Sequence, residues 1–131
     1  MGQYPIELIL TRQLASQLAM PVFIVDVHGT LVFYNEAAEG ILGRRFDETG
    51  AMAAIEWAEA FTPRDEAGRP LAPESLPLMI AVRDGRPAHT DFHIRGLDAV
   101  DRRIEVTAFP LIGHADRRVG AVAFFWETPA T

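Results

Sequence analysis

The segment VFIVDVHGTLVFYNEAAEGILG, residues 22–43, decides the fold of this chain. Two apolar runs, residues 22–25 and 31–34, flank a polar turn in which Gly29 can adopt a positive φ. Runs of this kind on either side of a turn predict a β-hairpin. Asn35 then provides a strong helix N-cap, worth about 0.5–2 kcal/mol, and Gly43 suits the C′ position of a short helix. The segment therefore predicts strand, turn, strand and helix in that order.

An amphipathic helix is predicted upstream, over residues 5–19. Pro5 suits its first position and Pro21 blocks its continuation. Apolar residues recur every four positions, with one more beside them, whereas Leu8 falls off this stripe. The stripe consists of Ile6, Leu10, Leu14 and Leu18, together with Ile9.

Downstream, the pattern predicts short helices within residues 52–61 and 75–83, separated by a proline-rich loop at 62–73. Three strands follow, because apolar and polar residues alternate over 88–95 and 103–108 and an apolar run covers 119–126. We expect an α+β fold, with a five-stranded antiparallel sheet and the short helices grouped on one face. The expected organisation is an N-terminal flanking helix (1–20), one domain (21–127) and a C-terminal tail (128–131).

Three motifs in order resemble the PAS domain, a sensory and interaction module of bacterial signalling proteins. The first is the opening segment, the second runs from Asp65 through Gly68 and Pro70 to residues 82–87, and the third is the pair of closing strands around Arg103-Ile104-Glu105-Val106 and Gly120-Ala121-Val122. The resemblance covers about residues 18–127 of the chain. It implies a module that binds a small molecule or haem, flavin or another chromophore, or one that binds nothing and dimerises.

Composition excludes several activities. The chain has no cysteine, its basic residues are all arginine, and its net charge is −6. Thiolate and lysine chemistry are therefore absent, and the acidic balance argues against nucleic-acid binding. No carboxylate–histidine dyad is identifiable, so we expect no enzymatic activity. Lacking an 18-residue apolar run and a signal peptide, the chain is expected to be cytoplasmic, with no membrane partner.

The residue content also argues against the cofactors that the resemblance to PAS domains implies. Cysteine-linked flavin or chromophores need the missing cysteine. Haem-binding relatives commonly use a histidine of the long helix before the last three strands, and residues 75–83 offer only Met79. Non-covalent flavin has a diffuse signature and is disfavoured. His89 and His93 share a strand face roughly 13 Å apart, too far to hold one metal ion.

Two sites are expected. A cavity between helices and sheet would take a small, largely apolar ligand, or its residues would simply fill the core; the candidates are Phe23, Val25, Ile41, Trp57, Met79, Phe92, Ile104 and Val106. The outer sheet face carries aromatic residues that need a cover. The N-terminal helix would provide it, on its own sheet or in a homodimer, through Ile6, Ile9, Leu10, Leu14 and Leu18 with Phe109, Leu111, Phe124 and Trp126.

The leading interpretation is a stand-alone PAS module that acts through a homodimer or a signalling partner. Two alternatives remain open: a ligand-free dimerisation or interaction domain, and a small cone-shaped α+β enzyme, which would need an inward Asp–His pair.

Overall fold

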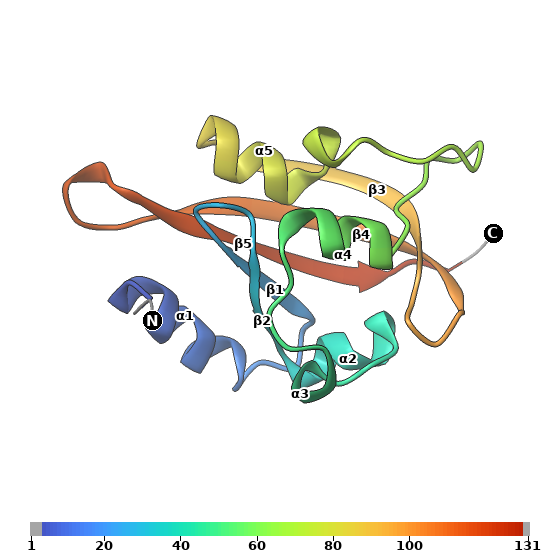
Figure 1. Ribbon diagram of the computed structural model, residues 1–131, viewed down its shortest axis with the longest axis horizontal. Coiled ribbons are helices and arrows are strands. Elements are labelled where there is room, and N and C mark those ends of the chain that lie inside the picture. The colour runs from blue at the N-terminus through green and yellow to red at the C-terminus, as the bar shows by residue number, and fades with distance from the viewer. Residues whose placement is uncertain (1–3, 130–131) are drawn as a thin grey trace.

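A computed structural model describes residues 4–129 (Figure 1). Residues 1–3 of the expected flanking segment and residues 130–131 of the expected tail lie outside the described residues. The strands are β1 (Val22–Asp26), β2 (Leu31–Tyr34), β3 (Ala88–Arg95), β4 (Asp101–Ile112) and β5 (Arg118–Glu127). The helices are α1 (Ile6–Ala15), α2 (Glu36–Leu42), α3 (Phe46–Thr49), α4 (Ala54–Ala60) and α5 (Pro77–Asp84), with short 3₁₀ turns at Pro73–Ser75 and His114–Asp116.

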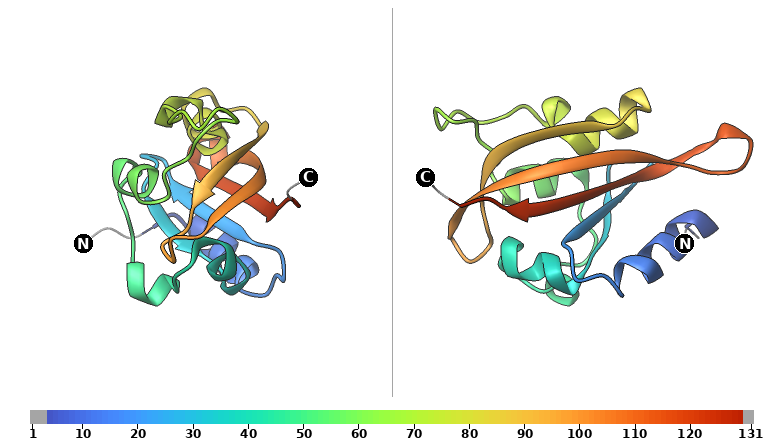
Figure 2. Two further views of the ribbon diagram at one scale, coloured as in Figure 1. Left: turned by 90° about the vertical axis from the view of Figure 1, so that its right-hand side faces the viewer. Right: turned by 180° about the vertical axis from the view of Figure 1, so that it is seen from behind.

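All five strands form one antiparallel sheet in the order β2-β1-β5-β4-β3. The helices α2, α4 and α5 pack on one face, here called the inner face, and α1 packs on the opposite, outer face (Figures 1 and 2). The expected α+β architecture, with five antiparallel strands and grouped short helices, is confirmed.

The opening segment folds as predicted. The chain turns between β1 and β2 with Gly29 at a φ of 82°. The Asn35 side chain accepts a hydrogen bond from the Ala38 amide at 3.1 Å and so caps α2. Gly43 ends the helix in the left-handed conformation. There the Leu97 amide donates to the carbonyl of Leu42, which holds the β3–β4 loop against the end of α2.

Helix α1 differs from its prediction in length and in orientation. It ends at Ala15 rather than at residue 19, because Asn35 Nδ2 donates to the carbonyls of Ala15 and Met20, both at 2.9 Å, and draws the chain toward β1. The side that faces the sheet carries Leu8 and Ala15, which are both 2% exposed. Leu8 lies close to Gly120, where the sheet surface offers room for a leucine.

The middle of the chain was the least predictable part. The structure has α4 within the predicted range 52–61, has α5 two residues later at its start and one residue later at its end than the predicted 75–83, and adds α3, which the sequence did not indicate. The three closing strands are confirmed. The hairpin of β4 and β5 is long, and its tip extends beyond the body of the domain (Figure 2, right). Within residues 4–129, no helix has both the length and the hydropathy needed to cross a bilayer.

Candidate functional site

The inner face encloses a small apolar cavity of about 60 Å³. It lies between the sheet and the segment that runs from α4 to α5. Every residue around it is apolar: Phe23, Leu42, Trp57, Phe61, Pro63, Leu76, Pro77, Leu78, Phe92, Ile94, Ile104, Val106, Ala123 and Phe125.

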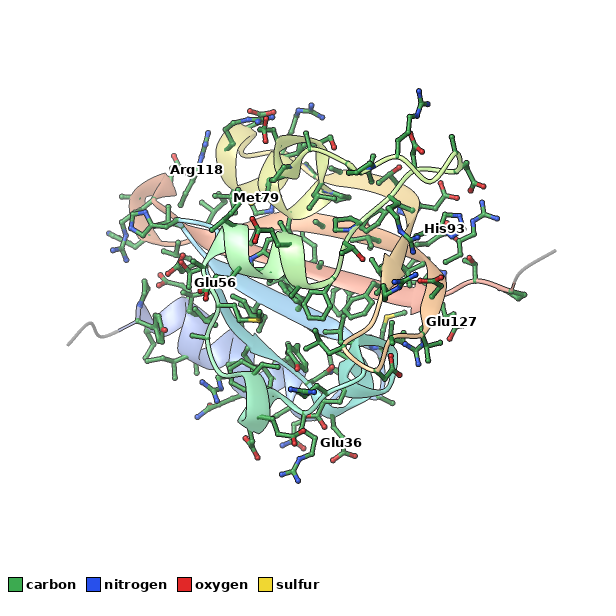
Figure 3. The ribbon with its side chains drawn as sticks, turned by 45° about the vertical axis from the view of Figure 1, so that its right-hand side comes forward. Glu36, Glu56, Met79, His93, Arg118 and Glu127 are labelled. Carbon is green, nitrogen blue, oxygen red and sulfur yellow. The ribbon has the colours of Figure 1, made fainter. Side chains whose placement is uncertain are left out.

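Five of the predicted cavity residues line this space: Phe23, Trp57, Phe92, Ile104 and Val106. The other three lie elsewhere in the inner layer. Val25 is fully buried in the core and Ile41 packs at its edge. Met79 reaches from α5 toward the start of α4, with its thioether beside Gly29 (Figure 3).

Sequence reasoning missed the residues that close the cavity from the side opposite the sheet. Phe61 follows the last residue of α4, Leu76 immediately precedes α5, and Leu78 lies in the first turn of α5. The predicted helices included these residues, but their pattern did not show which side faces the cavity. Phe125 could have been found, because it shares its strand face with Ala121 and Ala123. The signal for Phe125 was the alternation of the two side-chain faces along β5.

An aromatic cluster forms one wall of the cavity. The rings of Phe23 and Trp57 meet edge to face with centroids 5.3 Å apart. Trp57 Nε1 donates to the carbonyl of Gly29 at 2.9 Å, so the indole N–H is already satisfied. Behind this wall, Tyr34 donates its hydroxyl to the carbonyl of Arg44, and burial raises the pKa of this phenol. The wall offers no free polar group to a ligand.

These features do not fit a flavin or a haem. Sites for ligands of that size occupy about 300–1,000 Å³ and place a few polar groups around the ligand, whereas this cavity is far smaller and wholly apolar. Asn35, the only asparagine of the chain, already hydrogen-bonds to backbone groups near α1, so its side chain is not available to a ligand in the cavity. The arrangement can exclude water and accept a small apolar molecule.

The outer face is divided into two halves. Over β1, β2 and β5, α1 covers a second apolar cluster in which Leu18, Phe109, Leu111 and Phe124 are partly buried. The rest of the predicted stripe, Ile6, Ile9, Leu10 and Leu14, faces away from the sheet and is exposed. The helix therefore covers its own sheet mainly with the side that the stripe does not occupy.

The other half of the outer face, over β3 and the first part of β4, is ionic. Trp126 lies here rather than under α1, and Glu105 accepts from its indole N–H at 3.3 Å while also contacting His89 at 3.1 Å. Arg103 pairs with Asp91 and lowers the pKa of that carboxyl.

His93 instead faces Glu66, which lies in the loop between α4 and the 3₁₀ turn at Pro73–Ser75. The two histidines of β3 thus have different carboxylate partners. Within residues 4–129, no group of three or more metal-ligating side chains comes together.

No protein-family model matches this chain, and no curated protein matches it. Solved structures do match. The PAS domain of BvgS from Bordetella pertussis is similar with a TM-score of 0.69 and 17% identity, over 96% of this chain and 89% of that chain. A PAS domain from Colwellia psychrerythraea gives a TM-score of 0.63 and 14% identity, over 92% of this chain and 96% of that one.

A LOV protein from Rhodobacter sphaeroides is similar with a TM-score of 0.74 and 13% identity, over 95% of this chain and 69% of that chain. The matches agree with the strand order and the helical layer described above. The chain therefore has the fold of a PAS domain, as its motifs indicated.

Proposed function

We propose that this chain is a sensory and interaction module of cytoplasmic bacterial signalling, without catalytic activity, and that a small apolar molecule in the inner cavity is its ligand. The observation that carries the proposal is the cavity itself, enclosed between helices and sheet in a PAS fold and lined only by apolar side chains. An enzyme of this size would need inward polar groups to move protons, and the lining supplies none.

The volume of the cavity limits the ligand. A cavity of about 60 Å³ is smaller than an engineered cavity of about 150 Å³ that takes up benzene or xenon. A larger ligand would have to displace Leu76 or Leu78, which lie at the start of α5 over the cavity. The ligand class is thus a compact molecule without hydrogen-bonding groups.

Xenon is a suitable probe, because it tests for an accessible apolar cavity without requiring a known ligand. Under xenon pressure, we expect the methyl resonances of Ile104 and Val106 to shift in proportion to xenon concentration. In Ala123→Val, which adds volume to the cavity wall, the shifts should decrease. Native mass spectrometry of the purified protein would show a natural ligand directly. Absence of xenon shifts at both methyl positions would favour a filled core with no ligand.

The second candidate function is homodimerisation through α1. Its supporting observation is the unpartnered stripe, in which Ile6, Leu10 and Leu14 are 63%, 56% and 62% exposed. Two such stripes can pack on each other, since exposed apolar residues gathered on one helix face commonly mark an interface. Dimerisation would also give a module of this kind a route of output to a signalling partner.

Light scattering tests the dimer. Leu10→Gln combined with Leu14→Gln should convert a dimer to a monomer without unfolding, because neither side chain packs on the sheet. Ile55→Gln on α4 is the matched control, since Ile55 is 58% exposed but lies on the other side of the domain. A wild-type monomer, or a double variant that stays dimeric, would contradict the proposal.

The purified protein should also be colourless. The chain lacks cysteine, the helix α5 carries no histidine, and the cavity is too small for flavin or haem. An absorbance spectrum of protein purified without added cofactor checks this expectation. A stoichiometric Soret or flavin band would overturn it.

A further inference from the structure

A groove on the outer face runs between α1 and the edge strand β2, separate from the inner cavity. It has a volume of about 470 Å³, and α1 lies along it on the opposite side of the sheet from α4 (Figure 1). Its walls are apolar, formed by Leu8, Ile9, Val32 and Phe33. The polar side chains around it are Arg12, Gln13 and Ser16 on one side of α1, together with Tyr4 just before the helix. Apolar walls with a few polar groups, in this range of volume, are the general composition of small-molecule sites.

Arg12 is the one charged residue that lines this groove. Its guanidinium lies over the ring of Phe33 with 4.6 Å between the guanidinium carbon and the ring centroid, and 5.5 Å from the centroid of Phe46. The two rings themselves meet edge to face. Stacking of this kind holds a guanidinium in place while leaving the N–H groups at its edge free to donate.

Arg12 differs from most arginines of the chain because it forms no ion pair within residues 4–129. Most arginines of the chain form ion pairs, as Arg45 does with Asp47 and Arg102 with Asp98. Among residues 4–129, no carboxylate lies within ion-pairing distance of Arg12, and its guanidinium makes no hydrogen bond to another side chain. A fixed and unpaired guanidinium at an apolar groove complements a carboxylate, which it can bind through two parallel hydrogen bonds.

The three sides of α1 have different roles. Leu8 and Ala15 face the sheet, Ile6, Leu10 and Leu14 form the exposed stripe, and Arg12 with Gln13 and Ser16 faces the groove. Ile9 belongs to the stripe and also lines the groove, so the two surfaces meet at this residue, whereas Ile6, Leu10 and Leu14 lie outside the groove.

We propose that this groove binds a small amphipathic carboxylic acid, with the carboxylate on Arg12 and the apolar portion along Ile9, Val32 and Phe33. Gln13, which also lines the groove, brings an amide N–H donor to the same side of α1. This site is distinct from the inner cavity, which offers no partner for a charged group. The inference does not depend on the proposed ligand of the cavity.

Octanoate is the probe, and octanol is its neutral match. We expect octanoate to shift the backbone amides of α1 and β2 and the side-chain Nε–H of Arg12 in heteronuclear NMR. Arg12→Gln should weaken octanoate binding by about tenfold or more, the loss expected for a charge-assisted pair. Arg12→Lys should weaken octanoate binding less than Arg12→Gln does, because lysine keeps the positive charge although it loses the two parallel N–H donors of the guanidinium. Octanol should bind the groove more weakly than octanoate.

Arg44→Gln is the matched control, because Arg44 is exposed and also lacks a carboxylate partner but lies outside the groove. It should leave octanoate binding unchanged. Retained methyl shifts of Leu8 would establish that α1 is still docked in each variant. Failure of octanoate to bind, equal binding by Arg12→Gln, or shifts confined to Ile104 and Val106 of the inner cavity would each overturn the proposal. The first two outcomes would leave the cavity proposal untouched, whereas the last would assign the carboxylic acid to the inner cavity instead of the groove.

Discussion

The two faces of the sheet are built differently. The inner face is covered by several short helices and buries a continuous cluster that includes Phe23, Trp57 and Phe125. The outer face has one helix of ten residues, which covers half of it, and an ionic network over the other half. Burial of apolar area is the main stabilising contribution to folding. The inner face therefore defines the fold, while the outer face is free to carry features particular to this chain.

Asn35 connects the two layers. Its Oδ1 accepts from the amides of Val22 and Ala38, and its Nδ2 donates to the carbonyls of Ala15 and Met20. The residue is 1% exposed, so without its side chain the amide of Val22 would lose its partner in a buried place, and Ala38, Ala15 and Met20 would each lose one hydrogen bond. One side chain thus caps a helix of the inner layer and fixes the end of the outer helix.

The largest effect is expected for Asn35→Ala. The free energy of unfolding should fall by about 3 kcal/mol or more, because the buried Val22 amide is orphaned at about 1–3 kcal/mol and three further hydrogen bonds are lost at about 0.5–1.5 kcal/mol each. Denaturant unfolding measures the change, and hydrogen exchange should show that the amides of α1 lose protection first. A loss within the about 0.5–2 kcal/mol of a simple cap would show that the bonds to α1 contribute little.

Asn35→Ser serves as the control. A serine can still cap α2, but it is too short to reach the carbonyls of both Ala15 and Met20. We expect it to recover only the capping part of the loss and to leave α1 weakly protected. Full recovery of stability would show that the link between the two layers is unimportant.

A smaller effect separates the two sides of α1. Leu8→Ala should destabilise the protein by about 2–3 kcal/mol, at the lower end for buried leucines, since it removes the main contact of α1 with the sheet. Leu10→Ala should change stability by no more than about 0.5 kcal/mol, because this side chain is mostly in solvent. Thermal unfolding of both variants at low protein concentration, where a dimer would dissociate, measures the difference. Equal losses of stability in the two variants would contradict the docking of α1 through Leu8.

This pair of leucines also shows where sequence reasoning reached its limit. The stripe of α1 was found correctly as a pattern, yet the hydrophobic period alone assigned it to the sheet. The side that docks is chosen by fit, since Ala15 allows close approach and Leu8 fills the space above Gly120. Shape complementarity between distant segments is not encoded in the local period.

The opening hairpin, Asn35 and Gly43 were predictable because their signals are local. A turn glycine, an N-cap and a C′ glycine each act within a few residues. Two apolar residues that close the cavity, Phe61 and Leu76, flank the irregular stretch between α4 and α5. Their position depends on the path of the backbone across the sheet, which only tertiary contacts fix. The Arg12 groove was missed for the same reason, since Phe33 and Phe46 lie far from Arg12 in sequence.

The smallest effect concerns the polar rim of the inner layer. In the β3–β4 loop, Asp98 pairs with Arg102 at 2.9 Å, and Arg102 also donates to the carbonyl of Ile41 at the end of α2. The hydrogen bonds from Arg102, with that from the Val100 amide, lower the pKa of Asp98 from its usual 3.8 to about 2. The folded state therefore binds a proton on Asp98 less readily than the unfolded state does.

The sign of the pH dependence follows from that difference. Asp98 contributes to stability above its unfolded pKa of 3.8, and this contribution is lost as the pH falls toward about 2. Asp98→Asn should be less stable than the wild type at neutral pH, and the gap in melting temperature should close over that acid range. Because Asp91 and Asp101 also have lowered pKa values and remain in both proteins, their effects cancel in the comparison. A gap that stayed constant down to about pH 2 would show that the loss comes from the turn rather than from the charge of Asp98.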